Sequence, residues 1–187
     1  MKKRTITRLV LRLKNNSQHK IAWGITGAGH FLPESVDLLQ KLNNVDLFLS
    51  KAAEEVLKSY RLNERLEGLT VFYDRAASSP PVTRLYTGKY KAVVVAPATS
   101  NSVAKFVLGI SDNIVTNLFA HAGKTNVPAI VLPCDVEGDL DSQAPGGMVK
   151  VYPRDIDLDN IRRLAEFAGV TVVADIRELE KCLNTYL

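Results

Sequence analysis

The chain alternates between short runs of apolar residues and segments in which apolar residues recur every three or four positions. Short apolar runs rich in Val and Ile are typical of strands buried on both faces, and the longer spacing predicts amphipathic helices. Strands are predicted over residues 21–26, 45–49, 69–72, 93–95, 129–132 and 171–173, with an extra strand at 149–152. Helices are predicted from residues 33 and 51 onward and over 103–109, 113–123, 159–168 and 175–183.

Strands that alternate with helices in this way indicate parallel βαβ units, and therefore an α/β fold with a doubly wound parallel sheet in three layers. The run at Val93–Val95 is the centre of this pattern. We expect Pro97 to end its strand, and the polar turn after it to begin a helix.

Residues 133–147 interrupt the alternation. Asp135, Glu137, Asp139 and Asp141 alternate with other residues there, and glycines end the run. A long loop of this kind is often a lid or a contact arm. Its carboxylates do not have the spacing of a calcium loop, so we interpret it as a solvated acidic loop and predict no metal site.

The basic charge is concentrated at the start of the chain. The net charge is +4, but seven of the 24 Lys and Arg lie in residues 1–20, where there is no Asp or Glu. The rest therefore has 17 basic and 20 acidic residues, a net charge of −3, which argues against nucleic-acid binding. We predict a basic extension over 1–20, which includes the apolar patch Leu9–Leu13, and a single domain over 21–187. An interaction arm, a strand on a neighbouring subunit and a targeting segment all stay open for the extension.

No apolar run is long enough to cross a membrane. The two cysteines, Cys134 and Cys182, do not form a disulfide framework pattern, so a reduced cytoplasmic location is expected.

Three predicted strands are each followed by a turn with unusual composition. These turns are Thr26–His30, Ser50-Lys51 and Pro97–Ser102. Because the carboxyl ends of parallel strands lie at one edge of a sheet, the three turns are expected to meet there. Glycine amides, a lysine at a helix start, and hydroxyl and amide side chains suit one phosphate and one polar ring. The first turn lacks the third glycine of a dinucleotide fingerprint, so a mononucleotide is favoured.

Four motifs together resemble the FMN-binding flavoprotein superfamily, which includes cysteine decarboxylases and flavin prenyltransferases. They are Thr26-Gly27-Ala28-Gly29, Ser50-Lys51-Ala52-Ala53, Pro97-Ala98-Thr99-Ser100-Asn101-Ser102 and Asp112-Asn113. The opening Trp23–His30 is most similar to flavoproteins of archaeal type related to dihydromethanopterin reductase. The resemblance implies a flavodoxin-like (Rossmann-like) fold, FMN as the cofactor, and a homo-oligomer built from trimers with FMN near a subunit interface.

Departures from the family patterns separate its branches. The decarboxylases carry a His where this chain has Val82-Thr83, and a Pro-Ala-Met-Asn motif where it has Pro133-Cys134-Asp135. The prenyltransferases carry a Glu and an Arg that His121–Thr125 lacks. Both non-redox chemistries therefore lose key groups, and redox use of the flavin remains.

Site residues follow from the turns and the resemblance together. We predict that Thr26, Ser50 and Lys51 hold the phosphate and ribityl end, and that Thr99, Ser100 and Asn101 hold the ring. The full predicted cofactor set also includes Gly27, Ala28, Gly29, His30, Pro97 and Ala98. Ser102 is either a helix cap or a ligand. No catalytic residue is assigned.

Three further side chains are weighed individually. His30 is either a ligand or proton donor near the flavin, or a polar residue that caps the first helix. Cys134 is interpreted as a plain small residue, and Trp23 as core.

The expected function is electron transfer through FMN from a ferredoxin-like protein to a pterin such as dihydromethanopterin. A non-catalytic electron carrier and a cysteine-decarboxylase-type lyase are the alternatives.

Overall fold

The computed structural model describes residues 19–136 and 140–187. Its centre is a six-stranded, all-parallel sheet with the strand order β3-β2-β1-β4-β5-β8. The strands are β1 (Lys20–Ile25), β2 (Val45–Leu49), β3 (Thr70–Tyr73), β4 (Tyr90–Ala98), β5 (Ala129–Pro133) and β8 (Val170–Val172). The predicted α/β fold with a parallel sheet is confirmed.

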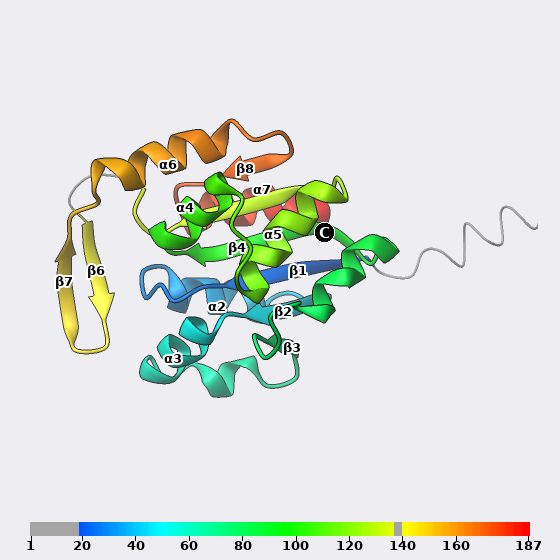
Figure 1. The fold of residues 1–187 in the computed structure, drawn as a ribbon. Helices are drawn as coiled ribbons and strands as arrows, with labels where there is room; N and C mark the ends of the chain where they lie inside the picture. The colour runs from blue at the N-terminus through cyan, green and yellow to red at the C-terminus, as the bar shows by residue number, and fades with distance from the viewer. Residues whose placement is uncertain (1–18, 137–139) are drawn as a thin grey trace, which may run out of the picture.

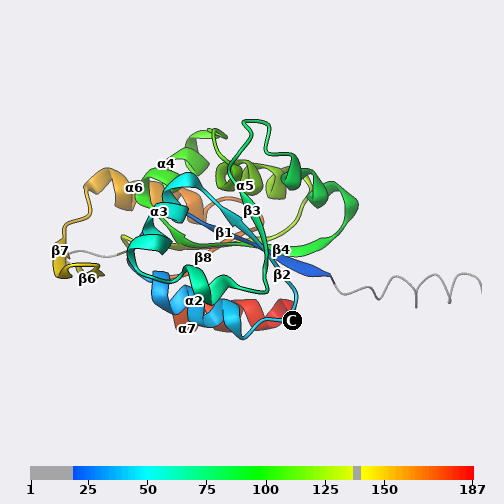
Figure 2. The same cartoon turned by 90° about the horizontal axis from the view of Figure 1, so that it is seen from below.

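Helices cover both faces of the sheet and complete three layers (Figures 1 and 2). The first face packs against α2 (Leu32–Gln40), α3 (Lys51–Ser59) and α7 (Ile176–Leu183), with the short turns η1 (Asn63–Leu66) and η3 (Asn184–Tyr186) nearby. The second face packs against η2 (Pro80–Thr87), α4 (Ser100–Leu108), α5 (Ile114–Lys124) and α6 (Asp155–Ala165).

Side chains alternate between the two faces because successive residues of a strand point to opposite sides. In β4, Val94 and Ala96 join the first apolar cluster, whereas Val93 and Val95 join the second. Trp23 is fully buried on the first face, and its Nε1 donates to the Ala96 carbonyl oxygen at 2.8 Å. The interpretation of Trp23 as core is therefore confirmed.

Two local predictions are wrong. β4 runs through Pro97 to Ala98, because Pro97 needs no N–H bond at the point where the ladder to β5 is already irregular. Residues 133–147 do not form one long loop: β6 (Leu140–Ala144) and β7 (Gly147–Val151) pair antiparallel in a hairpin that projects from the body (Figure 1). The extra strand predicted at 149–152 is the second strand of this hairpin.

Several expectations concern residues outside the described part of the chain. They are the basic extension up to residue 18 and two of the four loop carboxylates, Glu137 and Asp139. The division into 1–20 and 21–187 stays a prediction. Within the described residues, none of the helices is long and apolar enough to cross a membrane.

Candidate functional site

The Thr26 hydroxyl joins the carboxyl ends of β1 and β4. It donates to the Pro97 carbonyl oxygen at 3.0 Å and accepts from the backbone N–H of Thr99 at 2.8 Å. Thr26 is only 3% exposed, and its own N–H donates to the same Pro97 oxygen. The hydroxyl is already committed, so Thr26 positions the two turns against each other. Its predicted contact with a phosphate or ribityl group stays a prediction.

The glycines of the first turn let it lie against α3, with Gly27 at Ala52 in the first turn of the helix and Gly29 at Tyr60, its C-cap residue. A Cβ atom on Gly27 would lie 2.7 Å from the Ala52 Cβ, and one on Gly29 would lie 2.0 Å from the Tyr60 hydroxyl oxygen. Both distances are shorter than any tolerated carbon contact, so neither position accepts a side chain without rearrangement. The first turn and the α3 N-terminus therefore form one continuous surface.

The second turn supplies a helix cap and a lysine at the start of α3. The Ser50 hydroxyl oxygen accepts from the Ala53 N–H at 3.1 Å and caps α3. Lys51 is exposed at the first position of this helix and makes no ion pair with any described residue. An unpaired ammonium beside a helix N-terminus is a favourable place for an anion.

The third turn begins α4. The Thr99 hydroxyl oxygen accepts from the Ser102 N–H at 3.1 Å, so the cap is Thr99 and not Ser102. The Ser102 hydroxyl is paired with that of Thr99 at 2.9 Å. The Asn101 side chain is exposed and has no hydrogen bond to a described residue. Among the three polar side chains predicted at the ring, the Asn101 amide is thus the one left open for a ligand.

The three turns line two adjoining hollows that share Gly27, Thr99 and Asn101. We name them the Asp135 hollow, about 330 Å³, and the Lys51 hollow, about 370 Å³. The Asp135 hollow is further lined by Ala28, Gly29, His30, Ser100, Cys134, Asp135, Ser142 and Val151. The Lys51 hollow is further lined by Thr26, Ser50, Lys51, Ala52, Asp74, Ser102, Lys105, Asp112 and Asn113.

Ten of the twelve predicted cofactor residues therefore lie on this surface. Pro97 and Ala98 do not line either hollow, because both are buried as the last residues of β4. Pro97 contributes through its carbonyl oxygen, which holds Thr26 in place.

The lining of the Lys51 hollow includes two lysines and two aspartates. Lys105 lies 2.6 Å from the Asp112 carboxylate, and this pairing lowers the pKa of Asp112. Asp74 accepts from the Ile114 N–H at 3.1 Å and thereby satisfies the start of α5. Both carboxylates already have partners in the protein, whereas Lys51 has none among the described residues.

The Asp135 hollow includes residues that the sequence did not single out as ligands. Asp135 follows β5, and its carboxylate accepts a hydrogen bond from the Ser100 hydroxyl. Ser142 and Val151 come from the β6–β7 hairpin and close one side. The position of Asp135 after a strand at this edge was a usable signal, but nothing in the sequence placed the hairpin here.

His30 and Cys134 are both shifted towards their neutral forms. Burial lowers the pKa of His30, opposed by the nearby Glu34 and Asp135 carboxylates. Burial, with the adjacent Asp135, raises the pKa of the Cys134 thiol to about 12. A thiol that stays protonated is a poor nucleophile, which agrees with the interpretation of Cys134 as a plain small residue. His30 lines the hollow, and the alternative that it caps the first helix is wrong, because the N-cap of α2 is Phe31 and no side chain makes a cap hydrogen bond there. A role of His30 as a ligand or proton donor stays a prediction.

Comparisons with known proteins point to one family. An uncharacterized protein of Methanocaldococcus jannaschii is 42% identical over 90% of this chain and 96% of its own length. A dihydromethanopterin reductase (acceptor) of Methanosarcina mazei is 41% identical over 69% of this chain, which spans only 60% of that enzyme.

A solved structure is similar over nearly the whole chain. DmrB of Burkholderia xenovorans, crystallised in complex with FMN and described as a cubic protein cage for redox transfer, is 46% identical, with a TM-score of 0.85 over 92% of this chain and 97% of that one. This likeness agrees with the predicted flavodoxin-like, Rossmann-like architecture. Residues 10–184 match the family described as Flavoprotein, and the chain belongs to that family.

Proposed function

We propose that the protein binds FMN across the two hollows and is an FMN-dependent oxidoreductase that transfers electrons to a pterin. The observation that carries this proposal is the junction of the hollows at Gly27, Thr99 and Asn101, which offers a phosphate end and a ring end on one surface. Membership of the Flavoprotein family and the FMN complex of DmrB support the choice of cofactor.

Charge decides the direction in which the cofactor lies. The FMN phosphate belongs in the Lys51 hollow, where Lys51 and the N-terminus of α3 favour an anion. The lining of the Asp135 hollow includes the Asp135 carboxylate and no lysine or arginine, so the uncharged ring system belongs there. Asn101 lies between them and donates or accepts a hydrogen bond at the polar edge of the ring.

Bound FMN supplies a redox centre that takes up and passes on electrons. The residues of this chain set its affinity and its surroundings. Lys51 would balance part of the phosphate charge. The Asn101 amide would form a hydrogen bond with the ring in place of one with water. Ser100 and His30 line the Asp135 hollow and would lie close to the ring.

A dihydropterin is the proposed acceptor, and a ferredoxin-like protein is the proposed donor. The name of the Methanosarcina mazei relative supports the pterin. Because this chain spans only 60% of that enzyme, the substrate is part of the proposal. The description of DmrB as a cage supports a homo-oligomer, for which we propose trimers as the unit.

The experiment has two stages. Mild acid extraction of the purified protein should release FMN, and the stripped protein should take it up again. The reloaded protein should then reduce a dihydropterin when supplied with a reduced carrier. Flavin binding without pterin turnover would leave a non-catalytic electron carrier, and release of carbon dioxide from a peptidyl cysteine would indicate a lyase instead. Absence of flavin binding would refute all of these functions.

A further inference from the structure

The β6–β7 hairpin places a buried hydroxyl group at the Asp135 hollow. Ser142 is 8% exposed and lines this hollow. Its hydroxyl has no hydrogen-bond partner among the described residues. Within the same residues, the side-chain polar atom that is both sealed from water and unpaired is Ser35 Oγ, so the Ser142 Oγ still reaches the space of the hollow. The hairpin therefore offers the hollow a hydroxyl that the described part of the protein does not use.

The register of the hairpin turns this hydroxyl towards the site. β6 and β7 pair antiparallel, with Ser142 opposite Val149 and Asp141 opposite Lys150. Because side chains alternate along a strand, Val151 lies on the same face as Val149 and Ser142, and it also lines the hollow. Asp141 and Lys150 lie on the other face and do not line the hollow. The face that carries Ser142 is thus the one turned to the three turns, at the edge of the body from which the hairpin projects in Figure 1.

Two of the three polar side chains of the third turn are already engaged. The Thr99 hydroxyl caps α4, and the Ser100 hydroxyl donates to the Asp135 carboxylate. A carboxylate that accepts one hydrogen bond has room for others, so Asp135 is still an acceptor for a ligand. Ser142 and Asp135 therefore offer a donor and an acceptor in one hollow. A planar ring that carries a carbonyl oxygen next to an N–H group complements such a pair, and the pyrimidine end of a flavin carries both.

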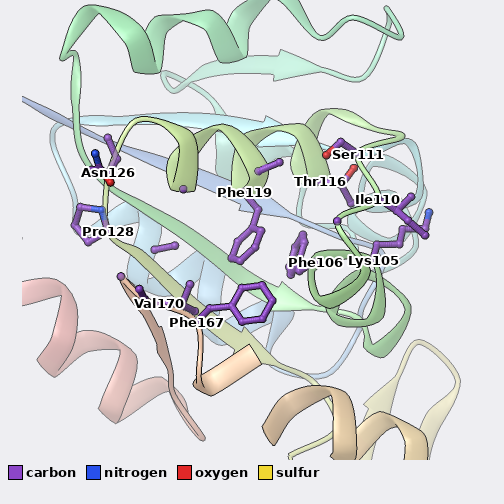
Figure 3. Close-up of a pocket in the computed structure, with 17 residues that line it drawn as sticks. Lys105, Phe106, Ile110, Ser111, Thr116, Phe119, Asn126, Pro128, Phe167 and Val170 are labelled. Carbon is purple, nitrogen blue, oxygen red and sulfur yellow. The ribbon is translucent and has the colours of Figure 1, made fainter. Parts of the chain in front are cut away.

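An apolar groove elsewhere on the molecule lacks such a group. Figure 3 shows this groove, of about 390 Å³, with Phe106, Phe119 and Phe167 on its walls. The buried polar residue in its lining is Thr116, and the Thr116 hydroxyl already donates to the Asn113 carbonyl oxygen at 3.0 Å. A ring with a polar edge would gain no hydrogen bond from a buried side chain there, so the Asp135 hollow matches it better.

We propose that Ser142 is a ligand of the FMN ring. Its hydroxyl donates to a carbonyl oxygen at the pyrimidine end of the ring, and Asp135 accepts from the N–H group beside that carbonyl. This role of Ser142 rests on the proposed function and adds to the cofactor site the hairpin, which none of the four motifs includes. The hairpin gains a contact when the flavin binds, so flavin binding and the stability of the hairpin are coupled.

The first experiment separates the two ends of the cofactor with lumiflavin, which carries a methyl group in place of the ribityl phosphate. Ser142→Ala should raise the dissociation constants of FMN and lumiflavin by the same factor, about fivefold, in line with the loss of one neutral hydrogen bond. Lys51→Gln should weaken the binding of FMN and leave that of lumiflavin unchanged. Lys150→Ala, on the other face of the hairpin, is the matched control and should bind both flavins as the parent does. Fluorescence titration of the FMN-free proteins measures these constants.

Three results of this titration would overturn the role of Ser142. The first is an affinity of Ser142→Ala for both flavins that equals the affinity of the parent. The second is a loss for FMN alone, because Ser142 would then contact the ribityl or phosphate end. The third is an equal loss for Lys150→Ala, because the effect would then belong to the hairpin as a whole.

Hydrogen exchange in the full chain tests the coupling. Saturating FMN should slow amide exchange by about threefold or more in residues 140–151 and in the turns 26–30 and 97–102 of the parent. In Ser142→Ala at saturating FMN, the turns should keep this protection and the hairpin should lose most of it. Protected turns with an unchanged hairpin in the parent would leave the FMN site standing and overturn the role of Ser142. Absence of protection in the turns would refute the proposed function, and the role of Ser142 with it.

Discussion

The two edges of the sheet treat their polar groups in opposite ways. At the amino edge, the Asp46 carboxylate is fully buried and accepts from Lys20 Nζ at 2.5 Å, the Tyr90 hydroxyl at 2.7 Å and Lys89 Nζ at 2.9 Å. At the carboxyl edge, Lys51 and the Asn101 amide have no partner among the described residues. Buried polar groups need partners, and among the described residues Lys51 and Asn101 leave donors at the carboxyl edge for something outside the chain.

This difference separates polar groups that stabilise the fold from polar groups that are available to bind a ligand. Asp46 looks like the more unusual residue in the sequence, since a carboxylate interrupts an apolar strand. Its hydrogen bonds to Lys20, Lys89 and Tyr90 lower its pKa, although burial opposes the shift. The cluster is internally satisfied, so it stabilises the start of β1, β2 and β4. We expect substitutions there to change stability and substitutions at the carboxyl edge to change ligand binding.

The largest effect is expected for Asp46→Ala. The substitution leaves Lys20, Lys89 and the buried Tyr90 hydroxyl without their acceptor. The free energy of unfolding should fall by about 3 kcal/mol. This value is at the low end of the cost of breaking a buried ion pair, because both lysine ammonium groups can still reach water. Urea unfolding of the FMN-free protein measures this. The control is Lys91→Ala, a half-buried lysine on the same edge whose Nζ makes one long hydrogen bond, 3.4 Å, to the Leu187 carbonyl oxygen. Equal losses of stability from both variants would contradict the comparison.

Removing the cation of the second turn should weaken cofactor binding without loss of stability. Lys51→Gln should raise the FMN dissociation constant by about tenfold to a hundredfold, because a hydrogen bond to a charged phosphate is lost. Riboflavin, which has no phosphate, should bind equally to both proteins. Fluorescence titration with each flavin measures the two dissociation constants. An equal loss of affinity for riboflavin would show that Lys51 does not bind the phosphate.

A smaller change is expected for the neutral amide. Asn101→Ala should weaken FMN binding by about fivefold, in line with one uncharged hydrogen bond, or shift the flavin potential. The Lys51→Gln variant provides the reference, because it should leave the potential nearly unchanged. Redox titration of both variants decides which end of the cofactor Asn101 contacts.

The pH dependence of stability should report the amino edge. The folded pKa of Asp46 lies below its ordinary value of 3.8, so its stabilisation is present above that pH and is lost as the pH falls towards the folded pKa. Asp46→Asn should therefore be less stable than the parent at neutral pH, and the gap should narrow below about pH 4. Thermal melts from pH 3 to pH 7 measure this difference in stability. A difference that stays constant over this range would show that the ionised carboxylate of Asp46 does not stabilise the fold.

The smallest effect is expected at Cys134. Cys134→Ala should leave FMN affinity and potential nearly unchanged. The raised pKa, about 12, predicts that iodoacetamide at pH 8 alkylates the half-buried Cys182 and leaves Cys134 unmodified in the folded protein. Peptide mapping after alkylation tests this prediction. Rapid modification of Cys134 would show a reactive thiolate and would contradict its interpretation as a plain small residue.

The three turns could be predicted because each one follows a strand with a simple apolar pattern, and parallel strands bring such turns to one edge. Thr26, Lys51 and Asn101 were found in this way. The hairpin could not be predicted, because Leu140–Ala144 has no alternation of apolar and polar residues. Its two contributions to the Asp135 hollow, Ser142 and Val151, were therefore missed.

The amino edge was missed for a different reason. Asp46 is more than forty residues away from Lys89 and Tyr90 in the sequence, and the register of β1, β2 and β4 brings the three together. The same limit applies to Asp135, whose bond with Ser100 joins the ends of two neighbouring strands. Local patterns predict elements and turns, but side-chain partners across the sheet depend on register.

The most direct test of the central claim is a crystal structure of the protein with FMN bound. We expect the phosphate at Lys51 and the N-terminus of α3, with the ring beside Asn101 in the Asp135 hollow. A flavin bound in the reverse orientation, or away from both hollows, would contradict this placement.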